Sequence, residues 1–260
     1  MVSYGGGANS TALLIGLHQH RIPVDLILFA DTGAEHPHTY AYLEVMDSWL
    51  KDHGMPPITR VWYTTKDGER LTLEQECLRS GSLPSIAYGH KKCSLKHKVT
   101  PQEKFCNHHP GCRDAWAKGE KVVKLIGYDA GEERRRTKAL PHDLQDPKYR
   151  KEYPLMDWGW YRGDCIQAIQ SAGLPLPGKS SCFFCPSMKP REIRTLYHQY
   201  SELLERALAI EDNARPNLRT VRGLGRDFAW RDFILADEAQ LTLPEVFSAD
   251  DLPCSCSVSG

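Results

Sequence analysis

The glycine-rich stretch from Ser3 to Thr11 constrains the fold of this chain more than any other feature. Three consecutive glycines and two small hydroxyl residues lie between a short apolar start and an apolar helical pattern. Glycines let the backbone bring N–H groups close to an anion, and the positive end of the following helix points to the same place. This stretch, called here the glycine-rich loop, predicts a phosphate-binding turn. A plain strand-to-helix turn has the same local pattern.

The residues after the loop predict a strand–helix–strand unit. Apolar positions over residues 9–20 suit a helix packed on a sheet, and the continuous apolar run 24–30 is typical of a buried parallel strand. Asp31, Thr32 and Gly33 follow directly after that run. Ligands of open α/β sheets bind at the carboxyl ends of the strands. We therefore expect this turn to face the glycine-rich loop.

Apolar patterns also predict the later elements of the chain. They indicate helices over residues 37–53, 161–172 and 190–210, and strands over 58–63, 122–126 and 153–155. A charged turn, residues 127–136, follows the strand 122–126 and should reach the same edge of the sheet. Residues 137–151 are polar and contain proline, which predicts a mobile loop. Residues 106–112 are expected to be a surface loop between helices, with a zinc site as the alternative.

The charge balance excludes a strong overall field. The chain has 33 basic and 33 acidic residues, so attraction of nucleic acid or of a membrane surface must come from local clusters. No apolar run reaches the roughly 18 residues that a membrane span needs. We expect a cytoplasmic protein with no membrane partner.

Nine cysteines are many for such a chain, and their spacing does not resemble a secreted disulfide framework. Cys182 and Cys185 form a CxxC, and Cys254 and Cys256 form a CxC in an expected flexible tail. Cys93 lies among lysines, which favour its thiolate form, although a lysine-rich stretch is also typical of a solvated face. The grouped cysteines indicate metal or redox chemistry.

Four motifs give the chain a resemblance to a known family over roughly residues 1–200. They are the glycine-rich loop, the Asp-Thr-Gly turn with a downstream proline at Pro37, the Cys93, Lys98 and Pro101 pattern, and a G-x-x-x-x-E-x-x-R block from Gly127 to Arg135. In this order the motifs resemble the phosphoadenosine phosphosulfate (PAPS) reductase-like family of the PP-loop ATP pyrophosphatase, or adenine nucleotide alpha hydrolase-like, superfamily. The resemblance implies a Rossmann-like three-layer α/β/α fold with a mainly parallel five-stranded sheet and a helical C-terminal part.

The chain departs from the family in two places. Where the family's loop usually carries Lys and Asp, this chain has Ala8 and Asn9, so a positive charge and a carboxylate available to Mg²⁺ are missing. Phosphate affinity would then rest on backbone N–H groups, on the hydroxyls of Ser10 and Thr11, and on arginines. The second departure is that Cys93 is followed by Ser94, where cluster-binding relatives have adjacent cysteines.

The resemblance implies a [4Fe–4S] cluster whose fourth ligand must therefore come from elsewhere. We expect Cys93, Cys165, Cys182 and Cys185 to be the four ligands. Zinc bound by the same set, and free or redox-paired thiols, are the alternatives. Taken alone, Cys165 is also compatible with a buried small apolar residue.

The family resemblance implies two chemistries. In the first, the protein binds ATP and Mg²⁺, adenylylates an acceptor with release of pyrophosphate, and sulfur displaces the adenylate, as in DNA phosphorothioation or tRNA thiolation. A cysteine desulfurase would be the sulfur donor. The nucleic acid would be held by Arg134 to Arg136, by the arginines of residues 215–231, or by partner proteins. In the second, a thiolate attacks PAPS or APS and thioredoxin releases sulfite. A nucleotide sensor with a structural metal is a third interpretation.

The family's reductases end in a Glu-Cys-Gly pattern that is absent here, which favours sulfur transfer. Residues 1–160 are expected to form the nucleotide-binding domain, and residues 161–260 a helical region packed on it. The expected catalytic residues are Asn9, Ser10, Arg135 and Cys256. The expected nucleotide-binding residues are Ser3, Gly5, Gly6, Gly7, Ser10, Thr11, Asp31, Thr32, Gly33, Gly127, Glu132 and Arg134.

Overall fold

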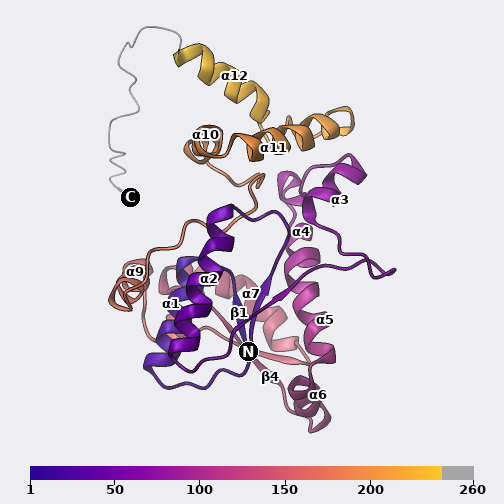
Figure 1. Ribbon diagram of the computed structural model, residues 1–260. Helices are drawn as coiled ribbons and strands as arrows, with labels where there is room; N and C mark the ends of the chain where they lie inside the picture. Colours follow the sequence, from indigo (N-terminus) through magenta and orange to yellow (C-terminus); the bar gives the residue numbers. More distant parts are fainter. Residues whose placement is uncertain (242–260) are drawn as a thin grey trace, which may run out of the picture.

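The computed structural model describes residues 1–241, with side chains through residue 237. Its centre is a five-stranded sheet in the order β3-β2-β1-β4-β5, and every neighbouring pair is parallel. The strands are β1 (Val2–Tyr4), β2 (Ile27–Ala30), β3 (Ile58–Val61), β4 (Val122–Ile126) and β5 (Tyr149–Glu152). The expected Rossmann-like three-layer fold is confirmed (Figure 1).

Alternating side chains of the strands divide the core between the two faces of the sheet. Val2 and Tyr4 point to the face covered by α1 (Ala8–Gln19), α2 (Pro37–Asp52) and α9 (Arg162–Ser171), where they join the first core cluster. Leu28 and Tyr149 point to the other face, where the third core cluster lies under α5 (Thr100–His108) and α6 (Pro110–Ala117). Burial on both faces explains why β2 has no polar side chain.

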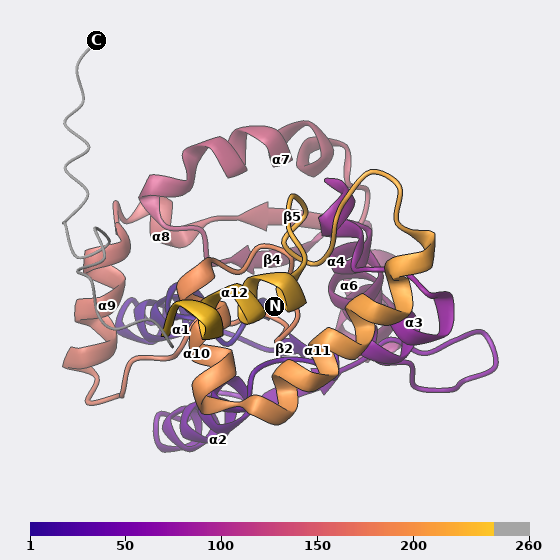
Figure 2. The same ribbon diagram turned by 90° about the horizontal axis from the view of Figure 1, so that it is seen from above.

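A helical layer lies beyond the carboxyl edge of the sheet (Figures 1 and 2). It contains α3 (Leu73–Ser80), α10 (Pro190–Gln199), α11 (Ser201–Ala214) and α12 (Trp230–Leu241). These helices share the second core cluster, which includes Leu73, Phe183, Leu204 and Trp230. The predicted apolar stripe over residues 190–210 is confirmed as core, since Ile193, Leu196 and Leu204 are buried there.

The remaining elements are short or peripheral. They are η1 (Ser85–Tyr88), α4 (Lys92–Ser94), the π-helical turn η2 (Leu95–Val99), η3 (Ala130–Glu132), α7 (Glu133–Gln145), α8 (Pro154–Asp157) and η4 (Arg215–Asn217). Among the described residues, no helix is long and apolar enough to cross a membrane.

Two local predictions are wrong. The expected mobile loop over residues 137–151 contains most of α7 and β5, although Pro141 lies inside the helix. Asp143 of α7 accepts hydrogen bonds from Lys151 and Tyr153, and this anchoring outweighs the proline. The strand expected over residues 153–155 lies a few residues earlier, because Pro154 begins α8.

Residues 106–112 also differ from the expected surface loop. They contain the end of α5 and the start of α6, which meet at His109. Cys106 and Cys112 are buried in the third core cluster. These two thiols therefore contribute to the packing under the sheet.

Candidate functional site

The glycine-rich loop joins the carboxyl end of β1 to the start of α1. Gly6 has a φ of +72°, and a Cβ there would lie 2.9 Å from Cγ2 of Thr39, so only glycine fits. Gly7 caps α1 without a side-chain hydrogen bond, and the first turn of α1 has no acidic residue. The first N–H groups of a helix have no partner within it, so this helix start can accept an anion.

The hydroxyl groups of the loop bond to the protein itself. Ser10 Oγ accepts a hydrogen bond from the Gly5 N–H at 3.2 Å and donates to the Gly7 carbonyl at 3.0 Å. Thr11 is fully buried with its Oγ1 3.2 Å from the Tyr4 hydroxyl. Ser3 donates to Gln102 of α5, on the opposite face from α1. Ser10 and Thr11 therefore hold the loop in place through contacts within the protein, and the Ser3 side chain, in β1, points to the opposite face of the sheet.

The turn after β4 meets the loop, as the sequence predicts. A Cβ on Gly127 would lie 3.1 Å from the backbone of Asn9, so the two chain segments are in close contact. Asn9 Nδ2 donates to Asp129 at 2.8 Å and to Glu132 at 3.1 Å. Arg162, from the first turn of α9, donates to Asn9 Oδ1 at 2.7 Å. Asn9 thus links three segments of the chain at the start of α1.

The arginines of this turn differ in their surroundings. Arg135 pairs with Glu132 and lies 4.2 Å over the ring of Tyr128. Arg134 is exposed. Arg135 is therefore held beside the loop through Glu132, whereas Arg134 faces outward.

The Asp-Thr-Gly turn lies next to the loop because β2 pairs with β1. The carboxylate of Asp31 accepts hydrogen bonds from the Gly33 N–H at 2.7 Å, the Tyr40 hydroxyl at 2.7 Å and Arg70 at 2.8 Å. Burial, together with the hydrogen bond to Asp31, raises the pKa of Tyr40. Gly33 has a φ of +70°, which favours glycine. Asp31 therefore fixes the turn.

A buried ion pair lies beside this turn. Lys98 Nζ is 2.8 Å from Oε1 of Glu35, whose side chain is completely buried. Thr32 donates to the same oxygen at 3.3 Å, and its hydroxyl lies 3.4 Å from the Cys182 sulfur. Burial lowers the pKa of Lys98, but Glu35, Cys182 and Cys185 outweigh it, so the pKa is raised. This lysine therefore supplies a fixed positive charge beside two thiols.

The segment that carries the CxxC also contacts the glycine-rich loop. Ser180 Oγ donates to the Gly5 carbonyl, and a Cβ on Gly7 would lie 3.5 Å from that of Ser180. Two residues further on, Cys182 pairs with Glu35 in a short antiparallel bridge. A cavity of about 180 Å³ opens nearby, lined in part by His36, His38, Lys179 and Ser181. The loop and the thiols therefore belong to one continuous region.

The four predicted metal ligands do not come together. Cys93, Cys182 and Cys185 pack against the second core cluster, whereas Cys165, a residue of α9, is fully buried in the first. Among the described residues, no three His, Cys, Asp or Glu side chains lie close enough, as they stand, to hold a metal ion. Thiols are suitable metal ligands by their chemistry, but as they stand Cys93, Cys182 and Cys185 are not close enough to hold one ion, and Cys165 lies in a different core cluster. Cys256, the remaining predicted catalytic residue, lies outside the described residues.

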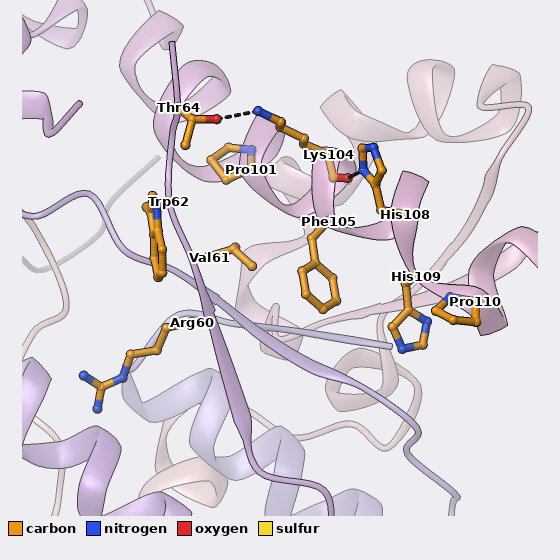
Figure 3. A pocket seen from close by; sticks show the side chains of 10 residues that line it. All are labelled: Arg60, Val61, Trp62, Thr64, Pro101, Lys104, Phe105, His108, His109 and Pro110. Atoms are coloured by element: carbon orange, nitrogen blue, oxygen red, sulfur yellow. Dashed lines mark hydrogen bonds between the residues drawn. The ribbon is translucent and has the colours of Figure 1, made fainter. Parts of the chain in front are cut away.

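A larger cavity of about 530 Å³ lies elsewhere, at the open edge of the sheet (Figure 3). It is lined by β3 and α5, with Trp62, Lys104 and Phe105 in its wall. No residue of the glycine-rich loop lines it. Two contacts connect its wall to the site: the Val61 carbonyl accepts a hydrogen bond from the Asp31 N–H at 2.7 Å, and Arg70, which lies 4.6 Å over the Trp62 ring, binds the Asp31 carboxylate.

Four site residues were missed from sequence. Asp129 and Arg162 hold Asn9, Glu35 holds Lys98, and Ser180 holds the loop. Asp129 and Glu35 each follow a predicted strand within a few residues, which is a usable signal. Arg162 and Ser180 belong to segments far away in sequence, so no local pattern identifies them.

Comparisons with known proteins do not place the chain in a family. No protein-family model matches it, and no curated protein matches it either.

Proposed function

We propose that the protein is an ATP pyrophosphatase that activates an acceptor by adenylylation for sulfur transfer, with nucleic acid, as DNA or tRNA, the acceptor class. One observation carries the proposal. The glycine-rich loop, the turn 127–135 and the cysteine-bearing segment 178–185 meet at the carboxyl edge of one parallel sheet. A nucleotide bound at the loop would therefore have thiols and fixed charges on one side of it.

The loop is suited to bind the phosphates. The start of α1 offers backbone N–H groups, and Gly6 lets the backbone turn sharply before them. The carboxylates of Asp129 and Glu132 lie within hydrogen-bond reach of Asn9. They would take the place of the missing loop aspartate as oxygen ligands for Mg²⁺, which would share the charge of the leaving pyrophosphate. Arg135 and Arg162 balance the remaining negative charge.

The reaction consists of two displacements. An acceptor oxygen attacks the α-phosphorus of ATP, the bond from that phosphorus to the bridging oxygen breaks, and pyrophosphate leaves. The outer sulfur of a persulfide supplied by a cysteine desulfurase then attacks the activated acceptor atom, and AMP leaves with the oxygen. A second thiol attacks the inner sulfur of the resulting S–S bond, so the outer sulfur stays on the acceptor, and the new disulfide is reduced by an external dithiol. The contribution of the protein is positioning and charge stabilisation, since the described loop residues include no nucleophile bonded to a base.

We further propose a thiolate-held metal centre, with a [4Fe–4S] cluster preferred over zinc. Cys93, Cys182 and Cys185 would be three of its ligands, and when bound it would supply redox chemistry or structural support. Burial raises the pKa of Cys182 and Cys185, and the charge of Lys98 opposes that rise at Cys182.

Pyrophosphate release from ATP, measured with and without DNA or tRNA, tests the proposed activity. We expect acceptor-dependent release, and Ser10→Ala should lower kcat/KM about tenfold, because the Gly5 N–H loses the group that fixes it. Ser48→Ala, on the exposed side of α2, is the matched control and should leave the rate unchanged. Absence of ATP turnover with every acceptor would overturn the proposal. Release of sulfite from PAPS or APS with thioredoxin would identify a reductase instead.

A further inference from the structure

We propose that the cavity beside β3 binds an unpaired base of single-stranded nucleic acid, with Trp62 as the stacking surface and Lys104 as a phosphate contact. The inference rests on the proposed function, because the occupant is a segment of the acceptor strand. The observations that carry it are the aromatic wall of the cavity, its positive charge and its position at the sheet edge that carries the glycine-rich loop.

Two segments with regular side-chain spacing form the walls of this cavity (Figure 3). From β3 onward, Arg60, Trp62 and Thr64 line it at every second position, as expected for one side of an extended chain. The lining residues of α5 are three or four positions apart and share one face of the helix: Pro101, Lys104, Phe105 and His108. A different side of α5 carries the buried residues Gln102 and Cys106. The face of α5 toward the cavity is therefore not used by the core.

The wall of the cavity offers a ring on which a base can stack. The structure describes all six tryptophans, and Trp62, at 41% exposed, is the only exposed one. Arg70 lies 4.6 Å over its ring and does not line the cavity. Phe105 adds a second ring, 5.8 Å from that of His109. Flat bases stack on exposed aromatic rings whatever their sequence, so these rings fit an unpaired base.

The charge of the cavity complements a phosphate backbone. None of the described residues that line it is acidic, and two are cationic. The charge of Arg60 is balanced by Glu44. Lys104 is exposed and donates to the neutral hydroxyl of Thr64, so its ammonium group keeps its full charge. Lys104 is therefore the cation available to a phosphate beside the stacked base.

The size and place of the cavity suit a segment of the acceptor. Its volume of about 530 Å³ is in the usual range of small-molecule sites, so a base with its sugar can enter. Trp62 and Thr64 follow the carboxyl end of β3, as the glycine-rich loop follows that of β1. Only β2 lies between these parallel strands, so about 10 Å separates them. A base in the cavity therefore lies on the flank of the proposed reaction site.

Binding of labelled oligonucleotides to the full chain without ATP tests the inference. The probes are oligothymidylate and oligouridylate of about twelve nucleotides, and fluorescence anisotropy measures their affinity. Trp62→Ala should weaken binding by about tenfold or more, and Trp62→Phe should keep most of the affinity, because a phenyl ring still stacks. Equal affinities of the wild type and Trp62→Ala, or equally tight binding of a duplex of the same length, would overturn the inference.

The salt dependence of the same binding tests the role of Lys104. Lys104→Met should reduce the slope of log affinity against log salt concentration by about 0.7, the value for one phosphate contact on a single strand. Trp62→Ala should leave that slope unchanged. Lys51→Met is the matched control, since Lys51 is exposed on α2 and does not line the cavity. Equal changes of slope in Lys51→Met and Lys104→Met would indicate general attraction and overturn the inference. Trp62→Phe and Lys104→Met keep the test usable if Trp62→Ala does not fold.

A comparison with catalysis separates this inference from the proposed function. Pyrophosphate release that depends on DNA or tRNA but is unchanged in Trp62→Ala and Lys104→Met would overturn the inference alone. Oligonucleotide binding that depends on Trp62, without ATP turnover with any acceptor, would support the base site and overturn the proposed function. AMP that binds as tightly as the oligonucleotides, with the same dependence on Trp62, would identify a pocket for a free nucleotide and overturn the inference.

Discussion

Polar side chains at the glycine-rich loop bind one another, whereas several buried polar atoms beside the cysteines have no partner among the described residues. Asn9 uses both its amide nitrogen and its oxygen within the protein. On the thiol side, Oε2 of Glu35, Nδ1 of His36 and Nδ1 of His97 are buried without a hydrogen bond. Unsatisfied buried polar groups are rare in folded proteins. Thr39, which lies beside Gly6, also has a buried hydroxyl without a partner. The comparison therefore shows that Asn9 joins segments of the protein with both ends of its amide, whereas the buried polar groups beside the cysteines are less completely bonded.

The largest expected effect comes from a carboxylate on the thiol side that is fully bonded. Glu211 is 1% exposed and accepts hydrogen bonds from the N–H groups of Leu224, Trp230 and Arg231. Glu211→Ala should lower the free energy of unfolding by about 4 kcal/mol, because three buried donors lose their acceptor. Denaturant unfolding measures this, with the exposed Glu205→Ala as control, expected within about 0.5 kcal/mol of wild type. A similar small change for both variants would contradict this account.

The next effect concerns the buried ion pair beside the thiols. Lys98→Met should lower the free energy of unfolding by about 2 kcal/mol, since Glu35 keeps a buried charge without its partner. This effect is smaller than for a fully buried pair, because the Lys98 side chain is 36% exposed. The double variant Lys98→Met with Glu35→Gln should recover part of that loss. A double-mutant cycle by chemical unfolding measures the coupling between them. Simple additivity of the two single effects would show that the pair is not coupled.

These two regions also differ in how far the sequence predicts them. On the loop side, the run 24–30 and the glycines indicate a strand–helix–strand unit, and β1, α1 and β2 form as expected. Hydrophobic periodicity and turn-forming residues are local features of the sequence, so they predict these elements without knowledge of the fold. The meeting of Gly127 with Asn9 could be predicted as well, because both follow strands that are neighbours in a parallel sheet.

On the thiol side, local patterns do not suffice. Cys77 and Cys165 both lie on helices with no motif around them, and the fold alone assigns them to different core clusters. Glu35 and Lys98 are 63 residues apart in sequence, so their pairing follows from the approach of η2 to the end of β2. The residue types suggested metal chemistry, but which of the described cysteines share a core cluster depends on the tertiary structure.

A smaller effect on stability is expected from a change at Asn9 of the glycine-rich loop. Asn9→Asp would place a third carboxylate against Asp129 and Glu132, within reach of the 2.8 Å and 3.1 Å contacts that the amide makes now. In the absence of divalent cations we expect the free energy of unfolding to fall by about 1–2 kcal/mol, because like charges repel and the amide donor is lost. Added Mg²⁺ should recover most of it, which thermal unfolding with and without Mg²⁺ measures. Wild-type stability should respond less to Mg²⁺, and an equal response in both proteins would contradict the expectation.

The smallest effect concerns the pH dependence of stability at the far edge of the sheet, away from the thiols. Burial raises the pKa of Asp146, but hydrogen bonds from the Lys148 and Tyr149 N–H groups, and Lys151, outweigh it, so the folded-state pKa is lowered. A lowered carboxyl pKa contributes stability above the unfolded value of about 3.9, and that contribution is lost as the pH falls through the folded value. Asp146→Asn should therefore lower the free energy of unfolding by about 0.5–1 kcal/mol at pH 7 and by almost nothing near pH 2. The amide oxygen of the variant can still accept both N–H groups, so only the contribution of the charge is lost. Urea unfolding of both proteins from pH 7 to pH 2 measures the difference, and a cost that stays constant over this range would show that the charge of Asp146 has no part in holding β5.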